Sequence, residues 1–482
     1  MAYKHGIYTQ EVATSLTPAT ETSAGLIVAF GTAPIHLATD SAGANKPVLC
    51  YDYKEAVAAF GYSDDFDKYT LCEVMQSAFT LFNVAPIVFV NVLDPEKHYK
   101  NNVYVEKGGI TSTPATVNAP VILSTLKVTS GDDEDEKELV KGTDYTAAFN
   151  DDGALVVTVI SNTKISDDKI YLHYKELDPT AVTASDVVGG VDANGISTGL
   201  QLVDEVFPRF RLIPGCIIAP KYSANSTVAA AMKAKTQNIS GNFQAVALVD
   251  IPTGTVGSYT AAASYKNTNN LDDSHLIVCY PKVSLGGVQY HLSTQAACLI
   301  NSVDIDGGDI PYVSPSNHNL QCDTACLADG TEIFYTQTQA NYLNGNGIIT
   351  ALNFVGGWKL WGNRTSTYPG STDPKDSFIP IRRMFNWISN TLVTTFWSKI
   401  DNPLNRNLIE SVIDSANIWF NGLQSRGAIL GGRVELLSTD NTTTELMDGI
   451  IRFHVFVTPA SPAREITFIQ EYDPSYISEL FG

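Results

Sequence analysis

The stretch Leu26-Ile-Val-Ala-Phe-Gly-Thr-Ala33 is an uninterrupted apolar run of strand length. A helical pattern follows over residues 68–82, with one apolar face formed by Leu71, Val74, Met75, Ala78, Phe79 and Phe82. A second apolar run, Ala85-Pro-Ile-Val-Phe-Val-Asn-Val92, comes next. Such runs are typical of strands buried on both faces. This β-α-β order therefore predicts a parallel or mixed sheet.

The alternation of strands and helices stops near Asp94 and resumes near Ile196. After the gap we expect strands over residues 215–219, 243–251 and 275–280, with helices over 223–238 and 291–303. Residues 96–190 instead contain short Val, Thr, Ile and Tyr runs at 121–123, 126–129, 154–160 and 170–174. This pattern predicts an inserted antiparallel β domain. With 16 acidic and 9 basic residues, a net charge of -7, the insert is expected to face solvent.

The two ends of the chain have a different character. Two helices are expected over residues 379–398 and 404–424, followed by strands over 427–437, 450–457 and 465–472. The last strand is detached, because Pro459 and Pro462 end the one before it. At the other end, an alternating piece at residues 5–12 precedes a Thr-, Ser- and Ala-rich piece at 13–23, which predicts a small strand on a flexible tether.

The predicted fold class is a multidomain α/β and α+β protein. A mixed-sheet α/β domain is discontinuous, over residues 25–95 and 191–355, and the β insert at 96–190 interrupts it. An α+β domain follows at residues 356–458. Extended arms, each with one strand, occupy residues 1–24 and 459–482.

Composition excludes several classes of protein. The 482 residues are 44% hydrophobic and 17% charged, which is typical of a folded chain, and the net charge of -20 argues against a nucleic-acid binder. The start, Met1-Ala-Tyr-Lys-His-Gly-Ile, lacks the apolar core of a signal peptide. No run approaches the roughly 20 apolar residues of a membrane span, so we expect no membrane insertion. Seven cysteines, an odd number, favour reduced, buried thiols and synthesis in the cytoplasm.

Two groups of residues resemble metal sites without completing one. His318, Cys322 and Cys326 could supply three zinc ligands, but the spacing of a structural site is missing. Buried thiols on a short helix are the alternative. Asp304-Ile-Asp-Gly-Gly-Asp309 resembles half of a calcium loop without the downstream Glu, and a turn that closes a helix is the alternative. We therefore expect neither a metal nor a cofactor.

Evidence for catalysis is also weak. The sequence contains no phosphate-binding or nucleophile motif, although residues distant in sequence can still form a triad. Arg382 and Arg383 begin an apolar helix that could be mistaken for a nucleic-acid patch. Intersubunit or intramolecular ion pairs, or plain solvation, are the alternatives.

Several segments, taken in order, resemble the sheath proteins of contractile phage tails and phage-tail-like bacteriocins. At the start these are Gly6-Ile-Tyr-Thr-Gln-Glu-Val12 and Val28-Ala-Phe-Gly-Thr-Ala-Pro34. Later ones are Tyr312-Val-Ser-Pro-Ser-Asn317, Gly357-Trp-Lys-Leu-Trp-Gly-Asn-Arg-Thr365, the helix with Arg382 and Arg383, and Asn421-Gly-Leu-Gln-Ser-Arg-Gly427. The closing pattern of residues 452–472 completes the series. The insert is a variable decoration in such proteins.

The resemblance implies a structural, non-enzymatic subunit of a virion or tail-like particle. Such subunits form stacked hexameric rings around a tail tube protein, bind baseplate and tail terminator proteins, and lend strands to a neighbour's sheet. The donated strands would be residues 5–12 and 465–472, pairing with strands 427–437 and 450–457. The alternative is that both ends of the chain fold back on their own domain. Their expected buried contacts are Ile7, Tyr8, Val12, Ile466, Phe468 and Tyr472.

The resemblance also implies mechanical work without ATP, by rearrangement of rigid subunits in an assembled lattice. The C-terminal domain, with a net charge of only -2 from residue 356 onward, would lie next to the tube. Contacts to the tube or between rings would come either from Arg382 and Arg383, or from Glu410, Asp414 and Arg426. The alternatives are the sheath of another contractile injection system, of the type VI or extracellular kind, and an α/β enzyme.

Overall fold

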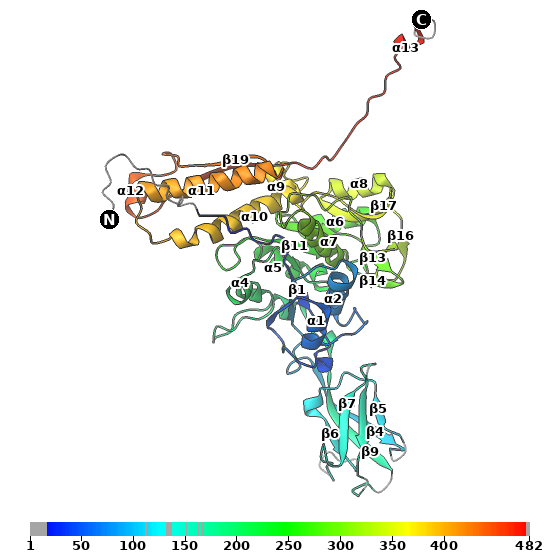
Figure 1. Ribbon diagram of the computed structural model, residues 1–482. Coiled ribbons are helices and arrows are strands. Elements are labelled where there is room, and N and C mark those ends of the chain that lie inside the picture. Colours follow the sequence, from blue (N-terminus) through cyan, green and yellow to red (C-terminus); the bar gives the residue numbers. More distant parts are fainter. Residues whose placement is uncertain are drawn as a thin grey trace, which may run out of the picture.

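The computed structural model describes residues 17–478 except 111–112, 132–136, 151, 162 and 166–167. Figure 1 shows a central α/β body, a β-rich insert at one end of it and a pair of long helices at the other. The described C-terminal segment, up to residue 478, extends away from the rest of the molecule.

An eight-stranded sheet forms the centre of the body, in the order β18-β17-β12-β11-β10-β1-β3-β2. Neighbours from β17 to β3 pair in parallel, whereas β18 and β2 pair antiparallel at the two edges. This mixed sheet confirms the predicted fold class at the coarse level. The strands are β1 Ile27–Gly31, β2 Pro47–Cys50, β3 Ile87–Asn91, β10 Cys216–Ile218, β11 Val246–Asp250, β12 Leu276–Cys279, β17 Ile348–Phe354 and β18 Gly357–Trp361.

The predicted apolar runs are the central strands of this sheet. Every residue of β1, β3 and β11 is buried, as expected for strands covered on both faces. The predicted domain boundary at residue 355 falls within the turn of the β17–β18 hairpin. The sheet therefore continues to Trp361, because β18 pairs with β17 along its whole length.

Helices pack around the sheet, and α7 contacts β1, β10, β11 and β12. The predicted helix at 68–82 is divided into α2 and a π-helical segment, Gln76–Leu81. The predicted helix at 223–238 is shorter, because the Asn225 side chain caps its start by accepting a bond from Thr227 N. The helices of the body are α1 Tyr53–Phe60, α2 Thr70–Met75, α3 Ala184–Val188, α4 Val206–Phe210, α5 Ser226–Ala234, α6 Tyr259–Thr268, α7 Leu292–Asp306 and α8 Gln337–Gly345.

A small antiparallel sheet, in the order β14-β13-β15-β16, joins the body. Cys326 ends β15, so the expected short helix for these thiols is wrong: residues 324–326 pair with β13 and β16 instead. Within the described ranges, no group of three or more His, Cys, Asp or Glu side chains could hold a metal ion. The strands are β13 Lys282–Leu285, β14 Val288–Tyr290, β15 Thr324–Cys326 and β16 Glu332–Ile333.

The insert consists of two three-stranded antiparallel sheets around a core of its own. Predicted strands at 126–129, 154–160 and 170–174 correspond to β6, β8 and β9. Residues 121–123 form only an isolated bridge, Val121 to Glu176, followed by a 3-10 turn. The strands are β4 Tyr99–Gly108, β5 Ala115–Val117, β6 Lys127–Thr129, β7 Tyr145–Phe149, β8 Leu155–Val159 and β9 Lys169–Leu177.

The two connections to the insert lie side by side. Asp178 N donates to His98 O at 2.9 Å, immediately outside the first and last strands. His98 is buried there, and its Nδ1 accepts a bond from Asp94 N at 2.9 Å. The insert therefore leaves and rejoins the body at one point.

The C-terminal region contains α9 Pro374–Ser377, α10 Ile379–Phe396, α11 Arg406–Ser425, β19 Ile429–Glu435, α12 Thr443–Met447, β20 His454–Pro459 and α13 Ser475–Ser478. Both long helices agree with the prediction. β19 and β20 form an antiparallel hairpin that packs through β19 on α11. No helix in the described part of the chain is long and apolar enough to cross a membrane.

Candidate intersubunit contact region

Helices α10 and α11 form the core of the C-terminal region. The Asn405 side chain accepts a bond from Leu408 N at 3.0 Å and so caps α11, and Pro380 stands in the first turn of α10. Trp387 and Trp419 meet between the helices with ring centroids 5.5 Å apart. Around them pack Met384, Ile388, Ala416, Phe420, Leu423 and Val434.

Residues 17–24, the N-terminal strap, lie against α10 and are held there by side chains of that helix. Arg383 Nη2 donates to Ala24 O at 3.1 Å, and Trp387 Nε1 donates to Thr22 O at 2.6 Å. Further along α10, Thr20 N donates to a threonine hydroxyl, Thr395 Oγ1, at 3.0 Å. The prediction of a flexible tether is therefore wrong for residues 17–23, because α10 supplies partners for alternate backbone groups.

Glu21 fixes the strap to the other helix. Its carboxylate accepts a bond from Trp419 Nε1 at 3.0 Å and forms an ion pair of 2.5 Å with Arg426. Burial alone would raise the pKa of Glu21, but these bonds outweigh it and lower the pKa. Arg426, one of the residues predicted to contact a tube or a neighbouring ring, is half-exposed and already paired within the subunit.

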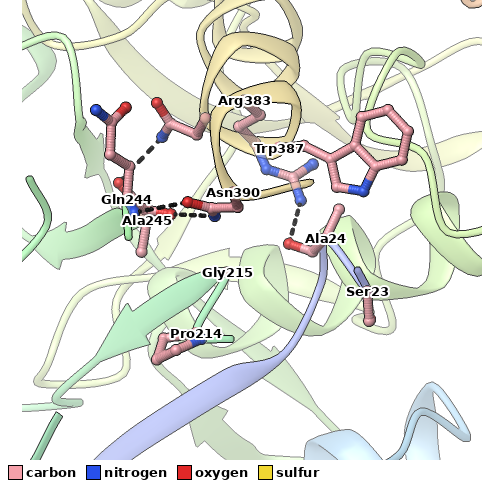
Figure 2. A pocket seen from close by; sticks show the side chains of 10 residues that line it. Ser23, Ala24, Pro214, Gly215, Gln244, Ala245, Arg383, Trp387 and Asn390 are labelled. Carbon is pink, nitrogen blue, oxygen red and sulfur yellow. Dashed lines mark hydrogen bonds between the residues drawn. The ribbon is translucent and has the colours of Figure 1, made fainter. Parts of the chain in front are cut away.

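Arg383 lies at the meeting point of the strap, α10 and α7. Its exposed fraction is 3%, and its Nη1 donates to Asp304 Oδ1 at 2.9 Å. Figure 2 shows the guanidinium directed toward Ala24. Arg383 thus forms an intramolecular ion pair, one of the alternatives left by the sequence. Asp304, the partner in this ion pair, lies in the last turn of α7, and that helix ends at Asp306.

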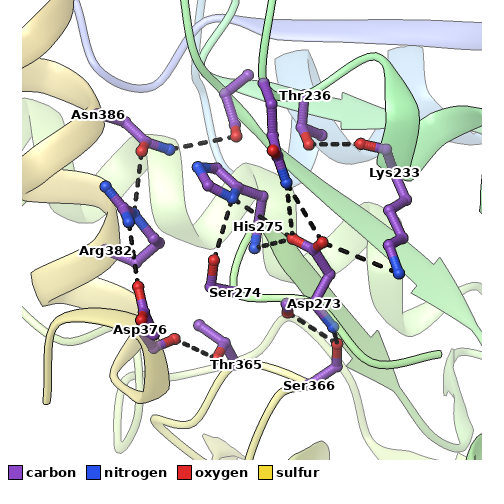
Figure 3. Close-up of polar contacts among 12 residues, drawn as sticks. Lys233, Thr236, Asp273, Ser274, His275, Thr365, Ser366, Asp376, Arg382 and Asn386 are labelled. Carbon is purple, nitrogen blue, oxygen red and sulfur yellow. Dashed lines mark hydrogen bonds and ion pairs between the residues drawn. The ribbon is translucent and has the colours of Figure 1, made fainter. Parts of the chain in front are cut away.

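Arg382 faces a separate polar cluster. It forms an ion pair of 3.3 Å with Asp376 and donates from Nε to Asn386 Oδ1 at 3.1 Å (Figure 3). Burial lowers the pKa of Arg382, while Asp376 opposes that shift. Both arginines therefore bind groups of their own subunit.

Polar side chains of α10 join this helix to the ends of the central strands. Asn390 accepts a bond from Gln244 N and donates to Gln244 O, both at 2.9 Å (Figure 2). Asn386 Nδ2 donates to Ala245 O at 3.2 Å. At Gly215, beside this contact, a Cβ would lie 1.9 Å from Ala24 O, so only glycine fits. These contacts connect the C-terminal region firmly to the body.

The outer face of α11 carries acidic side chains. Glu410 and Asp414, both predicted contact residues, are exposed and one turn apart. Glu410 pairs with Arg406 at 2.6 Å, an exposed pair that contributes little to stability. Within the described residues, Glu410 and Asp414 are therefore exposed to solvent.

The hairpin β19–β20 has one face on the core and one toward solvent. On the outer face, the Arg433 guanidinium lies 4.0 Å from the centroid of the Phe456 ring, and His454 stacks on the same ring at 4.4 Å. Val434 is buried on the inner face, whereas Val455 and Val457 are half-buried. Part of the apolar face of β20 is therefore left open.

The predicted strand at 465–472 pairs with nothing in the described part of the monomer. Residues 460–466 border a cleft of the body together with Tyr312, Gln337 and Arg364, and residues 467–473 continue as an extended segment away from the molecule (Figure 1). Ile466, Phe468 and Tyr472 are 72%, 86% and 76% exposed. The other predicted donor residues, Ile7, Tyr8 and Val12, lie outside the described residues.

No family model matches the chain. The tail sheath protein of Burkholderia phage BcepMu is 28% identical over 496 residues, which covers 100% of this chain and 99% of that protein. The chain is a homologue of contractile tail sheath proteins. The predicted resemblance is thereby confirmed.

Solved structures agree with this relationship at the level of the fold. A chain of the anti-feeding prophage baseplate is 15% identical, with a TM-score of 0.58 over 98% of this chain and 100% of that chain. A chain of the PVC extracellular contractile injection system, in the contracted sheath complex, is 13% identical, with a TM-score of 0.58 over 99% of both chains. The fold is therefore that of sheath proteins from such assemblies.

Sequence reasoning missed the strap and the polar contacts of α10. A signal was present, because Arg383 and Asn390 share a helix face with Trp387, and a large apolar side chain favours a buried face. Their partners, however, are backbone groups of distant segments, and a sequence pattern does not identify such partners.

Proposed function

We propose that this chain is the structural subunit of a contractile tail sheath, with no catalytic role and no cofactor. The similarity to a phage tail sheath protein over the whole chain supports this function most directly. The exposed apolar C-terminal segment supports this function independently. Large apolar side chains that are exposed in a monomer are typical of a surface that binds a partner.

In the proposed assembly, subunits form stacked hexameric rings around a tail tube protein, between a baseplate and a tail terminator. Neighbours are linked by strand exchange, in which residues 5–12 and 465–472 are the donated strands. The hairpin β19–β20 is the acceptor. Burial of one large apolar side chain contributes about 1.5–3 kcal/mol, so Ile466, Phe468 and Tyr472 would supply a substantial share of each contact.

We further propose that contraction drives the tube through a bacterial envelope. The energy would come from repacking of rigid subunits between two lattices. Of the two alternatives for tube or inter-ring contacts, the exposed face of α11 with Glu410 and Asp414 is favoured. Arg382 and Arg383 are less suited, because both guanidinium groups already bind inside the subunit.

The test is electron microscopy of the purified full chain. We expect hollow sheath-like tubes from the wild-type protein and none from Phe468→Ser. Gln470→Ser, which changes an exposed polar residue of the same segment, is the matched control and should assemble. Normal tubes from a chain lacking residues 465–482 would refute strand exchange at this end, and discrete particles with enzymatic turnover would refute the sheath.

A second candidate is the sheath of an extracellular contractile injection system. The fold likeness to the PVC sheath chain favours it, although such a likeness does not separate the two particles. Purification of the native particle distinguishes them, because a sheath attached to a DNA-filled head indicates a virion.

A further inference from the structure

Two of the segments that resemble sheath proteins, residues 312–317 and 357–365, meet at one cleft of the body. The cleft has a volume of about 820 Å³, and α8 and residues 460–466 also line it. None of the described residues in its lining belongs to the hairpin β19–β20. The cleft is therefore a surface separate from the proposed acceptor strands.

The lining of this cleft is rich in hydrogen-bond donors. Its side-chain amides include those of Asn317, Gln337, Asn341 and Asn363. The NH2 group of such an amide can donate to an anion. Among the described lining residues the only carboxylate is that of Glu465, and Arg464 of the same segment binds it at 3.4 Å. The body therefore contributes donors to the cleft but no negative charge.

Arg364 is fixed in this lining by its own subunit. Its Nη1 donates to Ser377 Oγ at 2.7 Å, and its Cζ lies 3.7 Å from the centroid of the Phe378 ring and 4.4 Å from that of Tyr368. A guanidinium has five N–H donors. No other side-chain hydrogen bond of Arg364 occurs within the described residues. The group is thus held in place with donors that remain available to a ligand.

Arg364 pairs with no carboxylate in the described part of the chain. Eight of the ten arginines do form such an ion pair. Arg211 is the other exception, but it is exposed, whereas Arg364 is half-buried. Burial lowers the pKa of Arg364, and the positive charge of Arg464 lowers it further. An anion in the cleft would stabilise both cations.

A second copy of this chain can supply the missing anion. The chain has 51 acidic and only 31 basic residues, so a second copy carries many carboxylates. A second copy would also come close to the cleft, because residues 460–466 lead into the segment 465–472 that is proposed to reach it. A carboxylate matches a guanidinium well, since two parallel N–H···O bonds can form between them.

We propose that Arg364 anchors a carboxylate-binding site in this cleft, and that the ligand is an acidic side chain of a second copy of this chain. This inference rests on the proposed sheath function. Arg364 would bind the carboxylate through its remaining N–H groups, and Arg464 would add a second positive charge from the C-terminal segment. Side chains form this contact, so it is distinct from the strand exchange proposed above.

The first test places a negative charge in the cleft. Gln337→Glu changes an exposed side chain in the first turn of α8, where a carboxylate favours the helix, so the monomer should stay folded. We expect the critical concentration for tube formation to rise about tenfold or more, because the new carboxylate repels the incoming one. Thr338→Glu, which adds the same charge outside the lining, is the matched control and should have an effect below about threefold. Equal effects of the two variants would overturn the inference.

The second test removes the anchor. Arg364→Gln should raise the critical concentration about thirtyfold or more, whereas Arg211→Gln should leave it unchanged. Thermal unfolding of each monomer shows whether loss of the bond to Ser377 has impaired the fold. If a folded Arg364→Gln chain assembles at the wild-type concentration, the inference is wrong.

Chemical cross-linking identifies the ligand, even where Arg364→Gln folds poorly. A small fraction of Arg364→Lys chains is assembled with an excess of isotopically labelled wild type, and a carbodiimide then joins amines to carboxylates that are in contact. Mass spectrometry of the tubes should find the unlabelled peptide with position 364 joined to a labelled acidic peptide. The monomer should lack this product. Its absence from the tubes, or a product only with Glu465 of the same unlabelled chain, would contradict the proposal.

Failure of this inference can be told apart from failure of the function on which it rests. If the wild-type chain forms no tubes, the sheath function fails. If it forms tubes that require residues 465–482, but the Gln337 and Arg364 variants assemble normally and give no cross-link, only the carboxylate site fails.

Discussion

Arg383 of α10 and Asp304 of α7 form an ion pair that is almost completely buried, with exposed fractions of 3% and 1%. The pair joins the C-terminal region to the body at the point where the strap enters the sheet. Removal of one partner from such a pair leaves a buried charge without compensation.

Asp304→Asn should therefore lower the free energy of unfolding by about 3–5 kcal/mol. Chemical denaturation monitored by tryptophan fluorescence measures this loss. Asp306→Asn is the matched control, since Asp306 ends the same helix but is exposed, and it should change stability by less than about 0.5 kcal/mol. Equal effects of the two variants would contradict the assigned role.

Trp387→Phe tests the strap. The change removes the indole N–H that binds Thr22 O at 2.6 Å, and we expect a loss of about 1–3 kcal/mol because the carbonyl loses its partner. Trp397→Phe, at a position 60% exposed, should have little effect. Thermal unfolding of each variant measures the difference. Identical unfolding curves for Trp387→Phe and Trp397→Phe would contradict the contact between the strap and α10.

His36 connects the body to the insert, because its ring lies 5.5 Å from the Phe149 ring in an edge-on contact. Burial lowers the pKa of His36 from 6.5 to about 4. The unfolded chain therefore binds the proton more tightly, and the neutral histidine stabilises the fold fully only above about pH 6.5. As pH falls from 6.5 to 4, we expect a loss of about 3 kcal/mol.

The measurement is the free energy of unfolding of the wild type and of His36→Phe over this pH range. Comparison of the two proteins separates the contribution of His36 from that of the carboxylates. The variant should lack the part of the pH dependence that His36 contributes. Identical pH profiles for the two proteins would show that His36 is not buried as a neutral ring.

Excision of the insert should leave the remainder folded. The insert has its own apolar core, and its ends meet at the bond from Asp178 N to His98 O, so a short Gly-Ser linker can replace residues 99–176 and keep Leu177 in the core of the body. We expect a cooperative thermal transition and normal tubes by electron microscopy. Aggregation of the excised chain would mean that the insert covers part of the body.

The central strands could be predicted from sequence because burial on both faces leaves a continuous apolar signal, as in Ile27–Gly31 and Val246–Asp250. The continuous apolar pattern is lost in strands that have one face exposed to solvent. Strand β4, Tyr99–Gly108, was not identified because Lys, Asn and Glu occupy its exposed positions. The strands β13 to β16 are too short to produce a pattern.

The contact region was predictable only in part. The exposed C-terminal segment has a local signature, two prolines followed by alternating apolar residues, and its role as a donated strand stays a prediction. Arg383 has no local signature, since its partner Asp304 is 79 positions away in the chain. The Thr-rich composition of residues 17–23 is typical of a linker, and only the side chains of α10 hold it in place.

The direction of the strap decides how it would carry a force. Its contacts run from Ala24 at Arg383 to Thr20 at Thr395, so the strap lies antiparallel to α10. A pull on the N-terminal end acts along the strap and across its hydrogen bonds. The bonds then share the load and must break together, whereas bonds pulled open from one end would fail one at a time. Force along the strap therefore loads all of its hydrogen bonds in shear at the same time. The strap should resist such a force better than the same bonds would if they were opened one by one.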